Sequence, residues 1–234
     1  MDNDRRGFLH AATAVGVAAV GSLAVAPRAE GKAPDDKKEA DEEISAPEDL
    51  MREHGVLNRI LLVFEEGVRR LRRKEDVPPD VFHKPATLVR TFVEDYHEKL
   101  EEKFIFPPFE KHKRLTDLVT VLRQQHEAGR KLTDVILHAA VADRFGRADA
   151  RQEVVRACEA FVRMYRPHEA REDTVLFPAL YTIVPAKEVK ELGERFEEEE
   201  HRLFGEDGFA KAVEQVAGIE KQLGIYDLAG FTPK

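Results

Sequence analysis

Residues 97–109 read HEKLEEKFIFPPF, and they align without a gap with residues 168–180, which read HEAREDTVLFPAL. One histidine, two glutamates, one phenylalanine and one proline coincide in the two stretches. Upstream of each stretch lies an isolated histidine, in MREH at residues 51–54 and in RQQH at residues 123–126. The isolated histidines are 72 residues apart and the long stretches 71 residues apart. The sequence therefore consists of two similar units, each built from a pair of helices.

Hydrophobic residues around these motifs recur every three or four positions, as at Leu57, Leu61 and Phe64, and no segment alternates as a strand does. Proline and glycine divide this region into four long segments of similar length. The sequence thus predicts an all-α fold, an up-down-up-down antiparallel four-helix bundle with additional short C-terminal helices. The expected helices cover residues 47–74, 83–110, 114–143, 149–180, 186–204 and 209–223.

The N-terminal segment, residues 1–26, resembles a twin-arginine-type signal peptide. Arg5 and Arg6 precede an uncharged run of mainly Ala, Val and Gly that ends at Ala26. This run is short for a membrane-spanning helix, so we expect it to be cleaved and to leave no stable membrane span. Cleavage after Ala26 and cleavage after Ala24 both fit the preference for small residues. We expect a periplasmic or otherwise exported protein that leaves the cytoplasm through the twin-arginine export machinery.

Composition divides the remainder of the chain. Residues 27–43 contain almost no hydrophobic side chain, so we expect a disordered linker there. Residues 44–182 hold the expected bundle, and residues 183–234 form its C-terminal helical appendage.

Charge and cysteine content exclude several classes of protein. The formal net charge is -8 and the basic residues are dispersed, so we expect no nucleic-acid partner. The single cysteine, Cys158, lies in a hydrophobic helical stripe and is expected to be a core residue.

Each repeat presents a histidine and a glutamate on one helix face, because residues four apart lie on the same side of a helix. The isolated histidine of each repeat adds a ligand from a neighbouring helix. Burying such polar groups without a partner costs several kcal/mol, whereas nitrogen and oxygen donors together suit iron or manganese, and zinc stays possible. The sequence predicts a metal centre formed by His54, His97, Glu101, His126, His168 and Glu172.

At these positions the chain resembles the hemerythrin-like, or HHE cation-binding, family, over roughly residues 47–181 and most specifically in HEKLEEKFIFP and HEAREDTVLFP. The resemblance implies two iron ions with an oxo or hydroxo bridge inside a four-helix bundle. It also implies that dioxygen, or another small diatomic or peroxide ligand, meets the iron. The implied ligands are His54, His97, Glu101, His126, His168 and one acidic residue of the fourth helix.

The acidic ligand of the fourth helix has two candidates. The internal repeat favours Glu172, four residues after His168, whereas the spacing in the oxygen carriers favours Asp173. Oxygen carriers place a further histidine at the position of Arg130, so either an iron position stays open or another side chain substitutes. The candidate substitute is His201, which follows four glutamates beyond the bundle.

These observations favour a non-haem di-iron binding protein that binds a small ligand, in sensing or protection for example, over a dedicated enzyme. A ferritin-like di-iron oxidase or iron-handling protein is one alternative, because Glu94 and Glu198 each precede a histidine by three residues. Tyr165 and Arg123 stand where that class would need further glutamates. A metal-free periplasmic interaction module is the other alternative. No nucleophile and base pair, phosphate loop or haem motif occurs, so any catalysis would be metal-centred.

Overall fold

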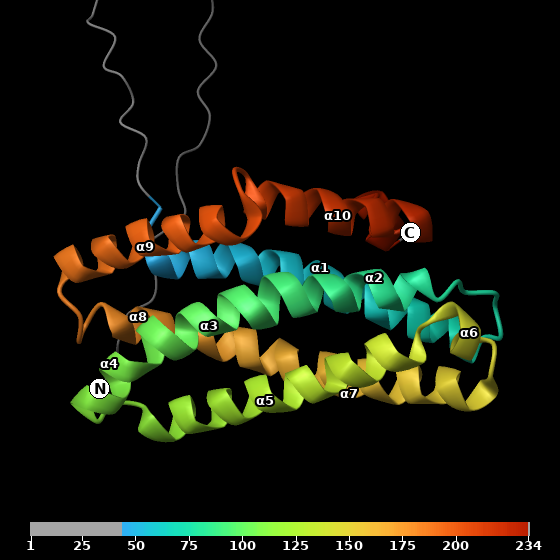
Figure 1. Ribbon diagram of the computed structural model, residues 1–234, viewed down its shortest axis with the longest axis horizontal. Helices are drawn as coiled ribbons and strands as arrows, with labels where there is room; N and C mark the ends of the chain where they lie inside the picture. The colour runs from blue at the N-terminus through green and yellow to red at the C-terminus, as the bar shows by residue number, and fades with distance from the viewer. Residues whose placement is uncertain (1–43, 234) are drawn as a thin grey trace, which may run out of the picture. The chain divides into compact units, whose positions relative to one another are not determined.

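The computed structural model describes residues 44–233 of the chain. Every regular element within these residues is helical, which confirms the all-α class (Figure 1). The expected signal peptide at residues 1–26 and linker at residues 27–43 lie outside the described residues. Among the helices of residues 44–233, none combines the length and hydrophobicity that a membrane crossing requires.

Four long helical segments pack along one another and form a helical bundle. Figure 1 shows that successive segments run in opposite directions. α1 packs against α2 and α7, and α5 packs against the same two helices. The segments are α1 (Ala46–Arg72); α2 (Asp80–Leu88), η1 (Val89–His97), α3 (Glu98–Leu100), η2 (Glu101–Ile105) and α4 (Phe106–His112); α5 (Thr116–Ala139); and α7 (Ala148–Arg171), η3 (Glu172–Leu176) and α8 (Phe177–Leu180).

Local sequence explains several of the helix boundaries. The Glu48 carboxylate accepts hydrogen bonds from the backbone nitrogen and the hydroxyl group of Ser45, at 3.1 and 2.7 Å, which caps α1. Lys113 and Leu115 adopt left-handed backbone conformations with φ of 54° and 52°, and they turn the chain from α4 into α5. The helix expected over residues 114–143 is shorter, because α5 ends at Ala139 and a separate short helix, α6 (Ala142–Phe145), follows.

Two helical segments widen into π-helical turns next to their glutamates. The backbone nitrogen of Phe106 donates to the carbonyl group of Glu101, five residues earlier, and that of Phe177 donates to Glu172 in the same way. Pro107 and Pro178 explain this spacing, because proline has no N–H and its ring clashes with the carbonyl group four residues earlier in a regular α-helix. Glu101 and Glu172 thus each occupy the first position of a π-helical turn.

One end of the bundle, here called the apolar end, has a core of hydrocarbon side chains. Phe82 on α2 and Phe145 on α6 pack with ring centroids 5.7 Å apart, and Val81 and Val154 are buried beside them in the core. The absence of a side chain at Gly67 lets α1 approach α2 closely, since a Cβ atom there would lie 2.7 Å from Phe82 Cζ.

The C-terminal helices pack on the bundle. The buried Phe196 of α9 (Ala186–Phe204) packs against Phe104 with tilted rings whose centroids are 5.9 Å apart, and Phe204 contacts Tyr96 edge-on at 5.4 Å. α10 (Gly208–Leu223) packs on α1 and α2, and its Glu220 accepts two hydrogen bonds from Arg59. The chain continues into a short 3-10 helix, η4 (Leu228–Phe231).

Candidate metal centre

Four buried histidines lie in the interior of the bundle, one from each long segment. His54 on α1 and His97 at the end of η1 have ring centroids 4.8 Å apart. His126 on α5 and His168 on α7 have centroids 5.0 Å apart. None of the four is more than 4% exposed. Each sequence repeat therefore contributes one closely spaced histidine pair.

Two fully buried carboxylates lie between the histidine pairs. Glu101 Oε2 is 3.6 Å from the Nε2 atom of His97 and 3.4 Å from that of His126. Glu172 Oε2 has the matching position, 3.2 Å from the Nε2 atom of His168 and 3.5 Å from that of His54. Each carboxylate therefore faces one histidine from each repeat.

The Nδ1 atom of each histidine, on the other side of the ring, takes part in a hydrogen bond. The pairs are His54 with Asp173 at 2.7 Å, His97 with Glu53 at 2.6 Å, His126 with Glu102 at 3.2 Å and His168 with Gln125 at 2.9 Å. Such contacts fix the ring orientation and leave Nε2 to face the central carboxylates.

These Nδ1 partners stand next to the central residues in the sequence. Glu53 and Gln125 directly precede the isolated histidines, and Glu102 and Asp173 directly follow the central glutamates. Glu53, Gln125 and Glu102 were not predicted as functional residues, although their matching positions in the two repeats could have indicated them. Asp173, expected as a possible ligand, instead contacts the outer side of the His54 ring.

The donor set fits a pair of metal ions. Within residues 44–233, both carboxylate oxygens of Glu101 and of Glu172 are buried without a hydrogen-bond partner, as is His126 Nε2. Donors bound at about 2.1 Å to one ion lie roughly 3.0 to 3.6 Å apart for angles between about 90° and 120°, which matches the nitrogen to oxygen distances of 3.2 to 3.6 Å. Two buried groups of side chains could each hold an ion: His54, His97 and Glu101, and His126, His168 and Glu172.

Electrostatics in the centre favour a bound cation. Burial, with the neighbouring Glu172 carboxylate, raises the pKa of Glu101 well above its usual range. Burial lowers the pKa of His126 to about 4 against the opposing hydrogen bond to Glu102, so this imidazole is neutral near pH 7. Burial also raises the pKa of Glu53 to about 8. A cation would bind the neutral imidazole and favour the ionised forms of both buried carboxyl groups.

Arg130 occupies the position where oxygen carriers have a histidine, and it does not face the centre as a ligand. Its Nη2 atom donates to Glu98 Oε2 and Glu102 Oε1, both at 2.6 Å. Glu98 also accepts a hydrogen bond of 2.6 Å from the hydroxyl group of the buried Tyr165. Arg130 therefore supports the side chains that surround the centre.

The structure does not bring His201 to the centre. This histidine is exposed on α9, and it belongs to none of the groups of potential ligands found in residues 44–233. The reason is the packing of α9, which turns the hydrophobic face with Phe196 and Phe204 toward the bundle. The expectation that His201 replaces the missing histidine has no support in this geometry.

The glutamates of the ferritin-like pattern also lie away from the six central side chains. Glu94 is buried, but it accepts a hydrogen bond of 2.5 Å from Thr133 and lies 3.1 Å from Arg90. Glu198 is exposed on α9. Neither belongs to a group of potential metal ligands within residues 44–233.

Comparison with known proteins supports the same interpretation. Residues 45–144 match the hemerythrin HHE cation binding domain. The uncharacterized proteins Mb2018 of Mycobacterium bovis, and MT2051 and Rv1995 of Mycobacterium tuberculosis, are each 49% identical over 223 residues, which cover 95% of this chain and 88% of the relative. No solved structure matches the chain.

The matched residues 45–144 contain four of the six central side chains, and the internal repeat supplies the other two, His168 and Glu172. The chain thus belongs to one family with these mycobacterial proteins, and its residues 45–144 match the hemerythrin HHE cation binding domain.

Proposed function

We propose that this protein binds two iron ions inside an up-down-up-down antiparallel four-helix bundle, and that its centre binds a small ligand such as dioxygen, nitric oxide or peroxide. The observation that carries the proposal is the set of five buried nitrogen and oxygen atoms without a hydrogen-bond partner, which four oriented histidines surround. Leaving such atoms unpartnered is costly, and a metal ion satisfies all of them at once.

The repeats suggest how the ions divide the ligands. One ion takes the histidine pair of the first repeat, and the other takes the pair of the second repeat. Glu101 and Glu172 each face a histidine of both pairs, so each carboxylate is placed to span the two ions. A set of imidazole and carboxylate donors suits iron or manganese.

Bound iron would bind small ligands reversibly and exchange electrons with them. The chain's own residues would control the access of these ligands to the site. The Phe177 ring stacks on His54 at 5.8 Å, and the Phe106 ring stacks on His126 at 5.5 Å. These hydrocarbon rings beside the histidines would limit the access of water and restrict entry to small ligands. Binding, sensing or protection fits this enclosed site better than turnover of a large substrate.

Metal analysis and an optical spectrum of the purified protein test the proposal. We expect about two irons per chain and near-ultraviolet charge-transfer absorption in the oxidised form. The His126→Ala variant should hold less iron, whereas His112→Ala, a substitution at an exposed histidine, should hold as much as the parent. Protein from iron-replete cells with neither iron nor the absorption would refute a di-iron function. A stoichiometric content of manganese or zinc would instead show that the centre binds that metal rather than iron.

A ferritin-like di-iron oxidase is the second candidate, favoured by a third group of potential ligands: Glu98, Glu102 and His126. Arg130 already bonds both carboxylates of this group, which weighs against a cation there. Counting iron in Glu94→Ala and Glu101→Ala separates the candidates. Loss of iron only in Glu101→Ala supports the hemerythrin-like centre, and loss in Glu94→Ala supports the oxidase.

We also propose export through the twin-arginine machinery, on the basis of the sequence of residues 1–26. The test is to replace Arg5 and Arg6 together by lysine and to fractionate the cells. The parent protein should appear outside the cytoplasm, and the variant should remain inside. Equal distribution of both proteins would contradict the proposal.

A further inference from the structure

We propose that the two metal positions are unequal, and that the position of the first repeat, formed by His54 and His97, binds its ion more tightly than the position formed by His126 and His168. This inference rests on the proposed two-ion centre. The difference in affinity would come from the side chains that bond the Nδ1 atoms of the histidines.

The side chains that face the ions do not distinguish the two positions. Each position has two histidines, and each central carboxylate reaches one histidine of each repeat at 3.2 to 3.6 Å. A difference in affinity must therefore come from the groups that bond the Nδ1 atoms.

The Nδ1 partners differ sharply between the repeats. Both histidines of the first repeat bond carboxylates, Asp173 at 2.7 Å and Glu53 at 2.6 Å. In the second repeat one partner is the neutral amide of Gln125 at 2.9 Å, and the other is the Glu102 carboxylate at 3.2 Å. The first repeat thus has two short contacts to acidic groups, and the second has one longer contact.

The carboxylate that contacts His126 of the second repeat, Glu102, is also bonded by two cations. Glu102 Oε1 accepts a hydrogen bond of 2.6 Å from Arg130, and Glu102 Oε2 accepts one of 2.7 Å from Lys99. Asp173 and Glu53 instead form their ion pairs with His54 and His97. Acidic groups therefore contact both histidines of the first repeat, whereas the histidines of the second repeat contact an amide and a carboxylate that cations already bond.

An imidazole that donates its Nδ1–H to a carboxylate is a stronger electron donor at Nε2, and loss of such a partner typically lowers metal affinity by about 10- to 100-fold. The first position has two acidic Nδ1 partners, and the second has an amide and a carboxylate that cations bond, so the first position should bind its ion at least about 10-fold more tightly. Arg130, which replaces the histidine of the oxygen carriers, is thereby a positioning residue that weakens the second position.

Titration of the metal-free full chain with cobalt(II), followed by calorimetry and visible absorption, tests the inference. We expect two steps whose affinities differ by about 10-fold or more. In Gln125→Glu the second step should tighten by about 10-fold, so that the steps approach each other. Gln124→Glu adds the same charge at the exposed neighbouring residue, and it should leave both steps nearly unchanged.

Two further variants assign the steps to positions. His97→Ala should remove the tight step and leave a weak one, whereas His168→Ala should leave the tight step. Two equal steps in the parent, or equal effects of Gln125→Glu and Gln124→Glu, would overturn the inference and leave the two-ion centre intact. Binding of no ion or of a single ion in the parent would instead refute the proposed function.

Discussion

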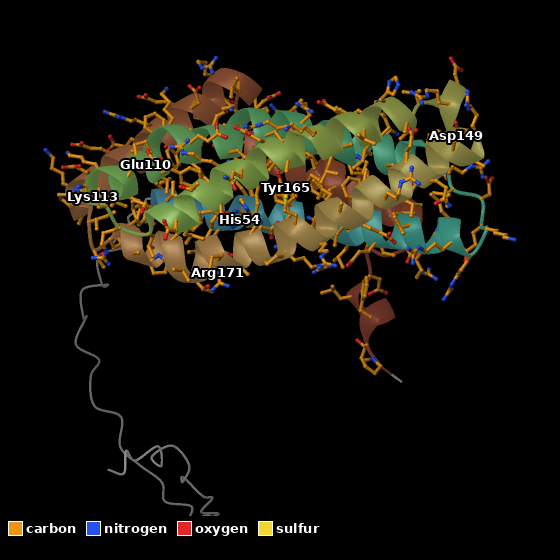
Figure 2. All side chains as sticks on the ribbon, turned by 90° about the horizontal axis from the view of Figure 1, so that it is seen from below. His54, Glu110, Lys113, Asp149, Tyr165 and Arg171 are labelled. Atoms are coloured by element: carbon orange, nitrogen blue, oxygen red, sulfur yellow. The ribbon has the colours of Figure 1, made fainter. Side chains whose placement is uncertain are left out.

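The metal centre and the apolar end lie on the same long helices, yet they are stabilised in different ways. At the apolar end, Phe82 and Phe145 pack against each other in the buried core, which also contains Val154, and none of these side chains has a polar atom. In the centre, the central glutamates and His126 have buried atoms without a partner in the described chain. Figure 2 shows His54 and Tyr165 within the length of the bundle, with Lys113 and Asp149 at opposite ends.

The difference teaches that one helix can carry a segment that folds unaided and a segment that needs a ligand. Burial of hydrocarbon is favourable whatever else is bound. Each unpartnered buried polar atom costs roughly 1 to 3 kcal/mol, against a total stability of roughly 5 to 15 kcal/mol. The centre therefore depends on metal far more than the apolar end does, and the predictions below test this division.

Removal of the metal should have the largest effect. An ion present at about 1,000 times its Kd stabilises the fold by about 4 kcal/mol, so the loss of two such ions lowers the free energy of unfolding by roughly 8 kcal/mol. After chelation, amide exchange should accelerate most around His126 and His168, and protection around Phe82 and Phe145 should largely persist. Equal acceleration throughout the bundle would contradict the division.

Phe82→Ala should destabilise the apolar end by about 3 to 5 kcal/mol, because the fully buried ring leaves a cavity. The iron content should stay at the parent value, since the ring does not contact the centre. Urea denaturation and metal analysis measure the two quantities. Phe231→Ala makes the same change at a residue that is 54% exposed, and it should cost less than about 0.5 kcal/mol. Loss of iron in the folded Phe82→Ala variant would show that the two regions are coupled.

The sequence predicted the helical class and the side chains that meet in the centre, because both depend on periodicity. A four-residue spacing places His97 and Glu101 on one helix face, and the repeat places His168 and Glu172 on another. The π-helical turns were not predicted. They depend on backbone hydrogen bonds that Pro107 and its counterpart disrupt, and hydrophobic periodicity does not report them.

The positions of the remaining candidates depend on tertiary packing, which one sequence does not specify. Asp173 and Glu172 are neighbours, and a widened turn at Glu172 determines that its carboxylate faces inward while Asp173 contacts His54 Nδ1. His201 lies on α9, whose orientation follows from the burial of Phe196 against the bundle, and this orientation leaves His201 exposed. Glu53 could have been predicted as a partner of the centre, because it directly precedes His54 just as the polar Gln125 directly precedes His126.

Tyr165→Phe tests the segment of the bundle between the metal centre and the apolar end. The Tyr165 hydroxyl group donates to the buried Glu98, and the ring lies 5.4 Å from that of His168. Removing the donor should cost about 1 to 3 kcal/mol while the iron content stays unchanged. Gly129→Ala should cost less in this variant than in the parent, because a Cβ atom at residue 129 would lie 2.1 Å from the lost oxygen. Equal costs in both backgrounds would disprove the steric coupling.

Cys158→Ala should have the smallest effect, about 1 kcal/mol. The thiol is fully buried and burial raises its pKa well above the usual range, so it is a packing group rather than a nucleophile. It is one of the residues that line an open groove of about 550 Å³, together with Phe64 and Val162, and neighbouring side chains there can relax into the vacated space. Thermal unfolding should show the small loss, and metal analysis should show the parent iron content. Rapid reaction of the folded parent with a thiol reagent would instead mean that this part of the core opens readily, and that hydrocarbon packing alone does not keep it closed.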